Sequence, residues 1–154
     1  MMVDFTLRPI SAYDAGEVLT LQRAAYATEA QIYGDPFLPA LTQTLDELRT
    51  ELAGCGGFVV LDGERIVAAV RTARHGNHVH IGRLTVAPDM QGSGLGSMLL
   101  GEVEANTDAE YLELFTGHLS AANMRLYERF GYVESHRKTL NADVELVYLR
   151  KPLR

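Results

Sequence analysis

The chemically most informative residues of the sequence are three glycines at alternating positions, Gly92, Gly94 and Gly96. An apolar stretch that ends at Val86 precedes them and apolar residues at helical spacing follow them, which predicts a strand, a turn and a helix. Unpaired N–H groups at a helix N-terminus carry partial positive charge, and glycine lets a ligand approach the backbone. The pattern favours a site for a phosphate-like anion. The alternative is a plain turn whose glycines only pack the helix.

Two other phosphate-binding loops do not fit this segment. A Walker A loop needs a Gly-Lys-Ser/Thr sequence, whereas the only lysines are Lys138 and Lys151, far downstream. The dinucleotide fingerprint G-x-G-x-x-G has a different spacing and belongs to an early βαβ unit, whereas the strands before these glycines are predicted as antiparallel hairpins. The sequence therefore argues against a P-loop and against a Rossmann-type dinucleotide site.

Asn123 and Tyr127 are four residues apart, so they share one face of a predicted helix. Leu126 and Phe130 have the same spacing and form the stripe that faces the core. A phenol on the polar side of such a helix could donate a proton in catalysis. Spacing alone favours the other interpretation, a tyrosine that packs its ring at the rim of the core.

His78 and His80 alternate along one predicted strand and face the same way. Histidine can accept a proton at neutral pH, which makes His80 a candidate general base. The alternative is that both are exposed strand residues beside a turn at His75. Because His75 lies in the turn, no cysteine is near and no carboxylate is close in sequence, no metal site is predicted. Glu113, on a later strand, could line a cleft or face solvent.

The elements that position these residues are predicted from alternation, helical spacing and turn signals. Asp62-Gly63 is a hairpin signal between two strands, and Thr44–Glu47 is a capping box ahead of a helix. The expected strands are Phe5–Arg8, Phe58–Leu61, Arg65–Ala73, His78–Val86, Tyr111–Thr116, Tyr132–Thr139 and Val144–Lys151. The expected helices run from Ser11 or Asp14 to about Ala30, from Thr44 to about Gly54, from Leu95 past Val103, and over Ala122–Phe130. This order predicts a mixed sheet with helices packed on it, an α+β (mixed α/β) chain without a linker.

The glycine segment resembles the acyl-CoA loop of the GNAT family, the Gcn5-related N-acetyltransferases. That loop is written Q/R-x-x-G-x-G/A, and Gln91–Gly96 matches every fixed position. The stretch Asn123–Tyr132 is similar to the family's segment that carries an asparagine and a tyrosine. By order of elements the resemblance covers roughly Phe58 to the C-terminus. It implies a GNAT-like fold over one domain, residues 1–154, with a largely antiparallel sheet of about seven strands and about four helices.

The resemblance also implies acetyl-CoA as cofactor and an N-acetyltransferase that transfers acetyl to a primary amine in a ternary complex. The pyrophosphate of CoA would bind the loop amides and the pantetheine arm would pair with the preceding strand, with help from Asn123. Tyr127 would protonate the departing thiolate, and His80 falls where several members carry a base. The cofactor-binding residues implied are Leu84, Val86, Gln91, Gly92, Ser93, Gly94, Leu95, Gly96, Ser97 and Asn123.

The acceptor side of GNAT enzymes is shaped largely by the first two helices and their connection. Here that region offers Tyr26, Glu29 and Tyr33, followed by Asp35 and Phe37. Acidic and aromatic groups together suit a cationic amine, by charge and by cation–π attraction. A small-molecule amine or a peptide N-terminus is the expected acceptor, with Glu113 as a further lining residue. The alternative is a surface loop whose aromatic side chains fill the core.

Composition limits the other functions. The net charge of −6 and the pI near 5.3 argue against a nucleic-acid partner or an anionic membrane surface. The single cysteine, Cys55, excludes an internal disulfide and indicates a cytoplasmic protein. No apolar stretch approaches the roughly 20 residues of a membrane helix. A homodimer is an expected assembly, and a non-catalytic acyl-CoA sensor or regulatory module is the alternative function.

Overall fold

Seven strands form one sheet in the computed structural model, which describes residues 4–153. The spatial order is β1-β2-β3-β4-β5-β7-β6, and all neighbours are antiparallel except the parallel pair β4–β5. The strands are β1 (Phe5–Pro9), β2 (Gly56–Asp62), β3 (Arg65–His75), β4 (His78–Val86), β5 (Tyr111–Gly117), β6 (Val133–Thr139) and β7 (Glu145–Pro152). The predicted α+β class, with its largely antiparallel sheet, is confirmed.

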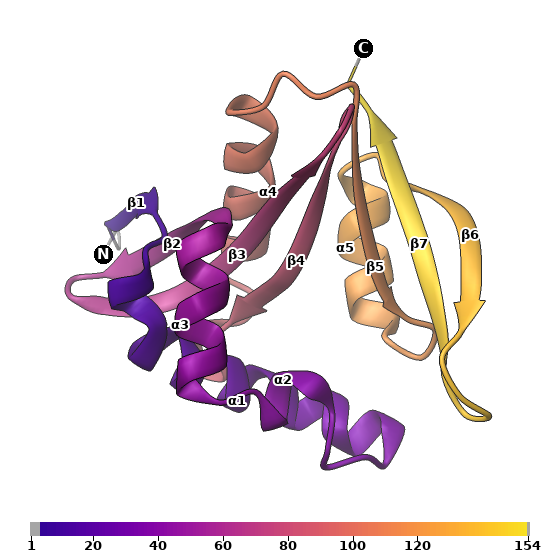
Figure 1. Ribbon diagram of the computed structural model, residues 1–154, viewed down its shortest axis with the longest axis horizontal. Helices are drawn as coiled ribbons and strands as arrows, with labels where there is room; N and C mark the ends of the chain where they lie inside the picture. The colour runs from indigo at the N-terminus through magenta and orange to yellow at the C-terminus, as the bar shows by residue number, and fades with distance from the viewer. Residues whose placement is uncertain (1–3, 154) are drawn as a thin grey trace.

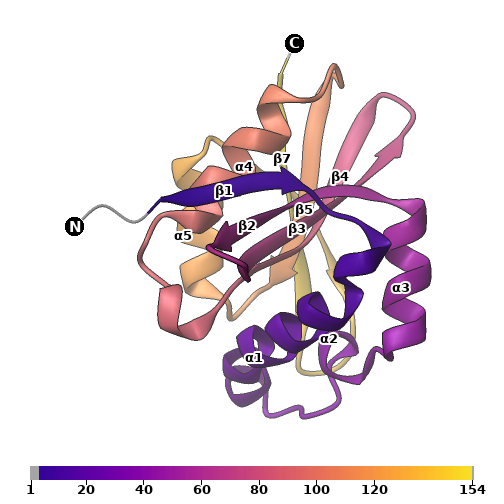
Figure 2. The same ribbon diagram turned by 90° about the vertical axis from the view of Figure 1, so that its left-hand side faces the viewer.

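Helices cover both faces of this sheet (Figures 1 and 2). They are α1 (Ala15–Tyr33), α2 (Pro39–Thr42), α3 (Leu45–Gly54), α4 (Leu95–Ala105) and α5 (Ala121–Arg129), with 3-10 turns at Ala12–Asp14 and Pro88–Met90. On one face α1 and α3 bury Leu19 and Leu48 against the first strands. On the other face α4 buries Leu99 and Leu100 against the middle and last strands. Burial of these two apolar layers fixes the sheet between the helices.

Local signals account for most element boundaries. The predicted turn after Asp62 joins β2 to β3, with Gly63 at φ 62°. The predicted capping box also forms, because the Thr44 side chain accepts from the Glu47 amide while the Glu47 carboxylate accepts from the Thr44 amide. Helix α1 runs three residues further than Ala30, to the left-handed Gly34.

The short helix α2 was absent from the predicted elements. Its sequence follows Gly34-Asp35-Pro36 and contains Pro39, which indicates a break in a helix. In the structure α1 ends at Gly34, and Pro39 occupies the first turn of α2, where a missing N–H costs nothing, so this proline begins a helix. No helix in residues 4–153 is long and apolar enough to cross a membrane.

The sheet divides between its two parallel strands. β4 and β5 meet near the top of Figure 1 and diverge below it. Their pairing consists of His78↔Tyr111, Val79↔Leu112 and His80↔Glu113. Beyond His80 the edge of β4 that faces β5 has no strand beside it, so it offers free N–H and C=O groups inside the sheet.

A β-bulge lies just beyond this point on β4. Ala69 pairs with Thr85 and Arg71 pairs with Gly82, so Arg83 and Leu84 together oppose a single residue of β3. Arg83 has φ 50° and is the one non-glycine residue with positive φ in residues 4–153. The bulge turns β4 away from β5 and changes the direction of the side chains that follow.

Candidate functional site

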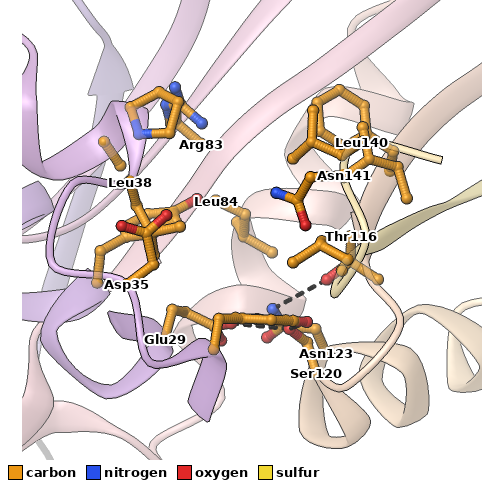
Figure 3. A pocket seen from close by; sticks show the side chains of 18 of the residues that line it. Glu29, Asp35, Leu38, Arg83, Leu84, Thr116, Ser120, Asn123, Leu140 and Asn141 are labelled. Carbon is orange, nitrogen blue, oxygen red and sulfur yellow. Dashed lines mark hydrogen bonds between the residues drawn. The ribbon is translucent and has the colours of Figure 1, made fainter. Parts of the chain in front are cut away.

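A cavity of about 310 Å³ lies where the gap between β4 and β5 meets the N-terminus of α5 (Figure 3). One wall comes from α1 and the segment that leads into α2, and the opposite wall comes from the connection between β6 and β7. Ile81 and Leu84 of β4 and Phe115 of β5 line it from the sheet. Its size falls in the range of small-ligand pockets, about 300–1,000 Å³.

Asn123 and Tyr127 both line this cavity from their shared face of α5, as their spacing predicts. The Asn123 side chain donates to the Thr116 hydroxyl at 3.4 Å, which orients the amide toward β5. Tyr127 is 6% exposed, and burial raises the pKa of its hydroxyl far above the usual value of a phenol. The hydroxyl therefore keeps its proton at neutral pH and can act as a donor.

Glu29 and Tyr33 of α1 reach the same end of the cavity through Ser120, the residue before α5. Ser120 Oγ donates to the Glu29 carboxylate at 2.7 Å and lies 2.7 Å from the Tyr33 hydroxyl. Because the serine proton goes to Glu29, the Tyr33 hydroxyl donates to Ser120, and it accepts from the Leu119 amide at 3.1 Å. This network fixes α1 to the start of α5 and holds one carboxylate near Asn123 and Tyr127.

The other predicted acceptor residues are placed differently. Tyr26 lines the cavity and has the Arg83 guanidinium 5.8 Å from its ring centroid. Asp35 lines the cavity while its carboxylate accepts from the Phe37 amide at 2.8 Å. Phe37 is 77% exposed and lies outside the cavity.

His80 lies outside this cavity and lines a neighbouring one of about 320 Å³. Its ring is tilted against Phe115 with centroids 5.5 Å apart, and burial lowers the pKa of His80 below its ordinary value. The two cavities are contiguous, since Tyr26, Ile81, Arg83 and Phe115 line both. A neutral imidazole thus stands one cavity away from Tyr127 and can accept a proton.

Glu113 lines neither cavity. Its carboxylate accepts from the Arg150 guanidinium of β7 at 2.6 Å, and the residue is 9% exposed. The Arg150 guanidinium also lies over the Tyr111 ring, 5.0 Å from its centroid. Glu113 is therefore held in an ion pair across the sheet.

The glycine segment begins α4 beside the gap in the sheet. Gly92 and Gly94 have φ of 82° and 79°, and a Cβ at either position would meet nothing within 4 Å. Helix α4 has no side-chain cap, so its first amides are open to a ligand. Gly96 differs, because a Cβ there would come within 3.1 Å of Leu126 on α5 and 3.9 Å of Leu84 on β4.

The remaining cofactor candidates surround this helix start. Gln91 and Ser93 are exposed in the turn, and Ser97 is partly exposed in the first turn of α4. The Leu95 side chain is buried in the core, so only its backbone faces the turn. Val86 pairs with Ala68 of β3 and belongs to the part of β4 that lies beyond its pairing with β5.

Several lining residues were not predicted. Arg83 reaches the cavity through a bulge that leaves no local signature. Leu140, Asn141 and Val144 come from a connection that looks like an ordinary hairpin loop. A serine before a helix predicts an N-cap, but the Ser120 side chain makes no cap bond and donates to Glu29 instead. In residues 4–153 no three His, Cys, Asp or Glu side chains group so that they could hold a metal ion.

Comparison with known proteins assigns the chain to a family of acetyltransferases. The family model described as "Acetyltransferase (GNAT) domain" matches residues 24–153. The chain belongs to this family, as the glycine segment and the asparagine–tyrosine stretch indicate. A curated relative, the UPF0157 protein YqkA of Bacillus subtilis (strain 168), is 28% identical over 132 residues, which are 85% of this chain and 38% of YqkA. The chain thus spans well under half of that relative.

Solved structures show the same fold. The ribosomal-protein-S18-alanine N-acetyltransferase of Escherichia coli has a TM-score of 0.81 at 18% identity, with 97% of this chain and 94% of that chain covered. The PaiA N-acetyltransferase of Thermoplasma acidophilum, in complex with coenzyme A, has a TM-score of 0.79 at 14% identity, with 94% and 98% covered. The yncA protein of Salmonella typhimurium, with its cofactor acetyl-CoA, has a TM-score of 0.76 at 15% identity, with 98% and 95% covered.

Proposed function

We propose that this chain acts as a single acetyl-CoA-dependent N-acetyltransferase domain that transfers acetyl to a primary amine by direct attack in a ternary complex. The observation that carries the proposal is the split of the sheet. The gap between β4 and β5 ends in the cavity that holds Asn123 and Tyr127, and the uncapped N-terminus of α4 lies beside it. Such a gap can receive an extended acyl carrier from one side and an amine from the other.

The residues around the gap fit CoA. The open space over Gly92 and Gly94 leaves room for a pyrophosphate against the amides that begin α4. The free edge of β4 at Leu84 and Val86 offers backbone groups to the pantetheine amides. When bound, acetyl-CoA would supply an acetyl thioester. Coenzyme A and acetyl-CoA are named with two structures of this fold, which supports this choice of cofactor.

In the reaction the amine nitrogen forms a bond to the acetyl carbon as the carbon–sulfur bond breaks. Tyr127, which keeps its proton, would donate it to the departing thiolate, and the proton that the newly acylated nitrogen loses would restore the phenol. The amine must first lose a proton, and His80 in its neutral form accepts it through water in the adjoining cavity. Glu29 attracts the cationic amine toward this end of the cavity.

A covalent intermediate on Cys55 is a poor alternative. Burial raises the pKa of the Cys55 thiol, so little of the nucleophilic thiolate exists at neutral pH. Cys55 lines the second cavity, beside Arg71 and Glu51, and not the cavity that contains Tyr127. Direct attack by the amine needs no such step.

The proposed function is tested by measuring the release of free thiol from acetyl-CoA in the presence of a panel of primary amines. Thiol release that depends on both protein and amine, with N-acetylated product found by mass spectrometry, supports an N-acetyltransferase. Tight binding of acetyl-CoA in calorimetry without thiol release from any amine would instead favour the acyl-CoA sensor. Absence of both binding and turnover would overturn both functions.

A further inference from the structure

Arg83 is the cation of the main cavity, and the backbone holds it there in an unusual conformation. Its φ of 50° lies in the left-handed region, which a side chain as large as arginine rarely adopts. Strained backbone of this kind persists where the surrounding structure enforces it, and it is concentrated at functional sites. The bulge at Arg83 and Leu84 allows both of these consecutive residues to line the cavity.

The guanidinium of Arg83 has no carboxylate partner within residues 4–153. The Arg83 guanidinium lies over the Tyr26 ring, 5.8 Å from its centroid, and both residues line both cavities. Many other arginines of the chain are paired with acids, including Arg8 with Asp14. Arg83 lies over a tyrosine ring and has no carboxylate partner in this part of the chain. Its five N–H donors are therefore available for a planar anion.

The second cavity has more positive than negative charge near Arg83. Arg71 is 5% exposed there and is paired with Glu51, with further hydrogen bonds to Gln22 and Gln43. Arg71 and Arg83 line the same cavity, and the charge of Arg83 adds to desolvation in lowering the pKa of Arg71. Glu51 is paired with Arg71, so the charge of Arg83 is left without a carboxylate among the described residues, and an anion beside Arg83 would balance it.

Two carboxylates line the main cavity together with Arg83. Glu29 is fixed by Ser120 next to α5, which carries Tyr127, whereas Asp35 lies nearer to Leu38 and accepts from the Phe37 amide (Figure 3). Figure 3 shows Arg83 and Glu29 on separate sides of the space, with Leu84 between them. An acceptor whose amine approaches Tyr127 beside Glu29 would therefore extend its remaining part toward Arg83.

We propose that the acceptor is an amphoteric small molecule of the amino-acid type, whose amine lies toward Glu29 and Tyr127 and whose free carboxylate binds Arg83. The inference rests on the proposed function and narrows its acceptor. It selects a free amino acid over a peptide N-terminus, where an amide replaces the α-carboxylate. A polyamine, which has cations at both ends, would place one of them against Arg83.

The experiment compares matched acceptors on matched variants. Rates of thiol release are measured with free L-amino acids, with the corresponding L-amino acid amides and with spermidine, on wild type, Arg83→Gln and Arg83→Lys. Since a bidentate charged pair is stronger than an ordinary hydrogen bond, wild type is expected to prefer acid over amide by roughly 10–100-fold in kcat/KM. Arg83→Gln should remove that preference by slowing the acid alone, and Arg83→Lys should keep part of it.

Arg49→Gln is the control, because Arg49 is an exposed residue of α3 that pairs with Asp46. It should leave the preference unchanged. Equal rates for acid and amide in wild type, or a preference for spermidine, would overturn the inference while the thiol release itself supports the proposed function.

A binding measurement separates the two proposals if no amine reacts. N-acetyl-L-amino acids and their amides are titrated into the CoA-saturated protein by calorimetry. Tighter binding of the acid that disappears in Arg83→Gln supports the carboxylate site without turnover. Failure of the acid to bind more tightly than the amide overturns it.

Discussion

At the scale of single residues, Tyr127 and Tyr132 differ in what their hydroxyls face. The rings meet edge to face with centroids 6.1 Å apart, and burial raises the pKa of both hydroxyls. The Tyr132 hydroxyl is buried without a hydrogen-bond partner in residues 4–153. Tyr127 lines the cavity instead. Two similar phenols thus provide a candidate donor and an internal control for it.

Tyr127→Phe should lower kcat by about 10²–10⁴-fold, because it removes a proton donor that acts in the transition state. The dissociation constant of CoA and the Tm should change little, since the ring and its packing remain. The measurement combines kcat, CoA titration and thermal unfolding on one preparation. Tyr132→Phe is the matched control and should keep full activity. Full activity of Tyr127→Phe with an amine whose chemistry limits the rate would assign thiolate protonation to solvent.

His80→Ala should change the pH dependence of kcat/KM. The imidazole accepts a proton only when neutral, so wild-type activity falls as the pH decreases through the pKa of His80. Since burial lowers that pKa, the midpoint of this acidic limb should lie below 6.5. The variant should be slower at neutral pH and lack the limb. His78→Ala, on the same strand and stacked on Tyr111, is the control. An unchanged profile in His80→Ala would transfer the role to Glu29 or water.

The sequence predicted the surroundings of those residues whose neighbours in space are also near in the chain. Asn123 and Tyr127 share a helix face because their spacing is local. The surroundings of Glu113 could not be predicted in this way, since its partner Arg150 is 37 positions away and becomes a neighbour only when β5 pairs with β7. Arg83 was missed for the same reason, because a bulge depends on the pairing of two strands.

At the scale of elements, the turn into α4 combines two uses of glycine. Gly94 provides a left-handed N-cap with open space above it, whereas Gly96 allows α4 to approach Leu126 of α5. The open space at Gly94 favours ligand access, and the close approach at Gly96 favours helix packing. The packing interpretation thus holds for Gly96, and the anion site stays a prediction for Gly92 and Gly94.

Gly94→Asp should abolish the stabilisation of the protein by CoA. The change adds bulk and a negative charge where the pyrophosphate is expected to bind. It also strains a backbone with φ 79°, so a control must share that strain. Gly63→Asp, at φ 62° in the β2–β3 turn, provides it. Thermal unfolding with and without CoA measures the effect, and both variants should lose Tm while only Gly94→Asp loses the shift. A retained shift in Gly94→Asp would place CoA elsewhere.

Strands and helices were predictable where turn residues and periodicity agree, as at Asp62-Gly63 and at the Thr44 capping box. The helix α2 was not, because one proline can end a helix or begin one. The division between β4 and β5 also leaves no local trace, since it depends on which strands fail to pair.

At the scale of the whole molecule, one apolar layer spans the gap between β4 and β5, because Val79 and Ile81 of β4 and Leu112 and Leu114 of β5 belong to the same buried cluster. A ligand that binds only this folded arrangement stabilises it. At 100 times its dissociation constant, CoA should contribute about 2.7 kcal/mol to the free energy of unfolding. For a chain of this size that corresponds to a rise in Tm of roughly 5–11 °C.

ATP and NAD at equal concentration should shift the Tm far less, because neither has a pantetheine arm to pair with the free edge of β4. Thermal unfolding monitored by circular dichroism gives the comparison, with 3′-phosphoadenosine 5′-phosphate as a control for the nucleotide end alone. An ATP or NAD shift as large as that of CoA would contradict the cofactor assignment.

The interrupted sheet also has a consequence for the rates at which backbone amides exchange their hydrogens with deuterium. The middle of a sheet is ordinarily its most protected part, but three residue pairs alone join β4 to β5 here. Amides of β4 beyond His80 that point into the gap should therefore exchange sooner than those bonded to β3. Within residues 4–153, the edges of β4 and β5 that face the gap have no strand between them. A molecule lying between them would slow exchange on both edges together, so deuterium uptake would map an occupant strand by strand, whether or not it reacts.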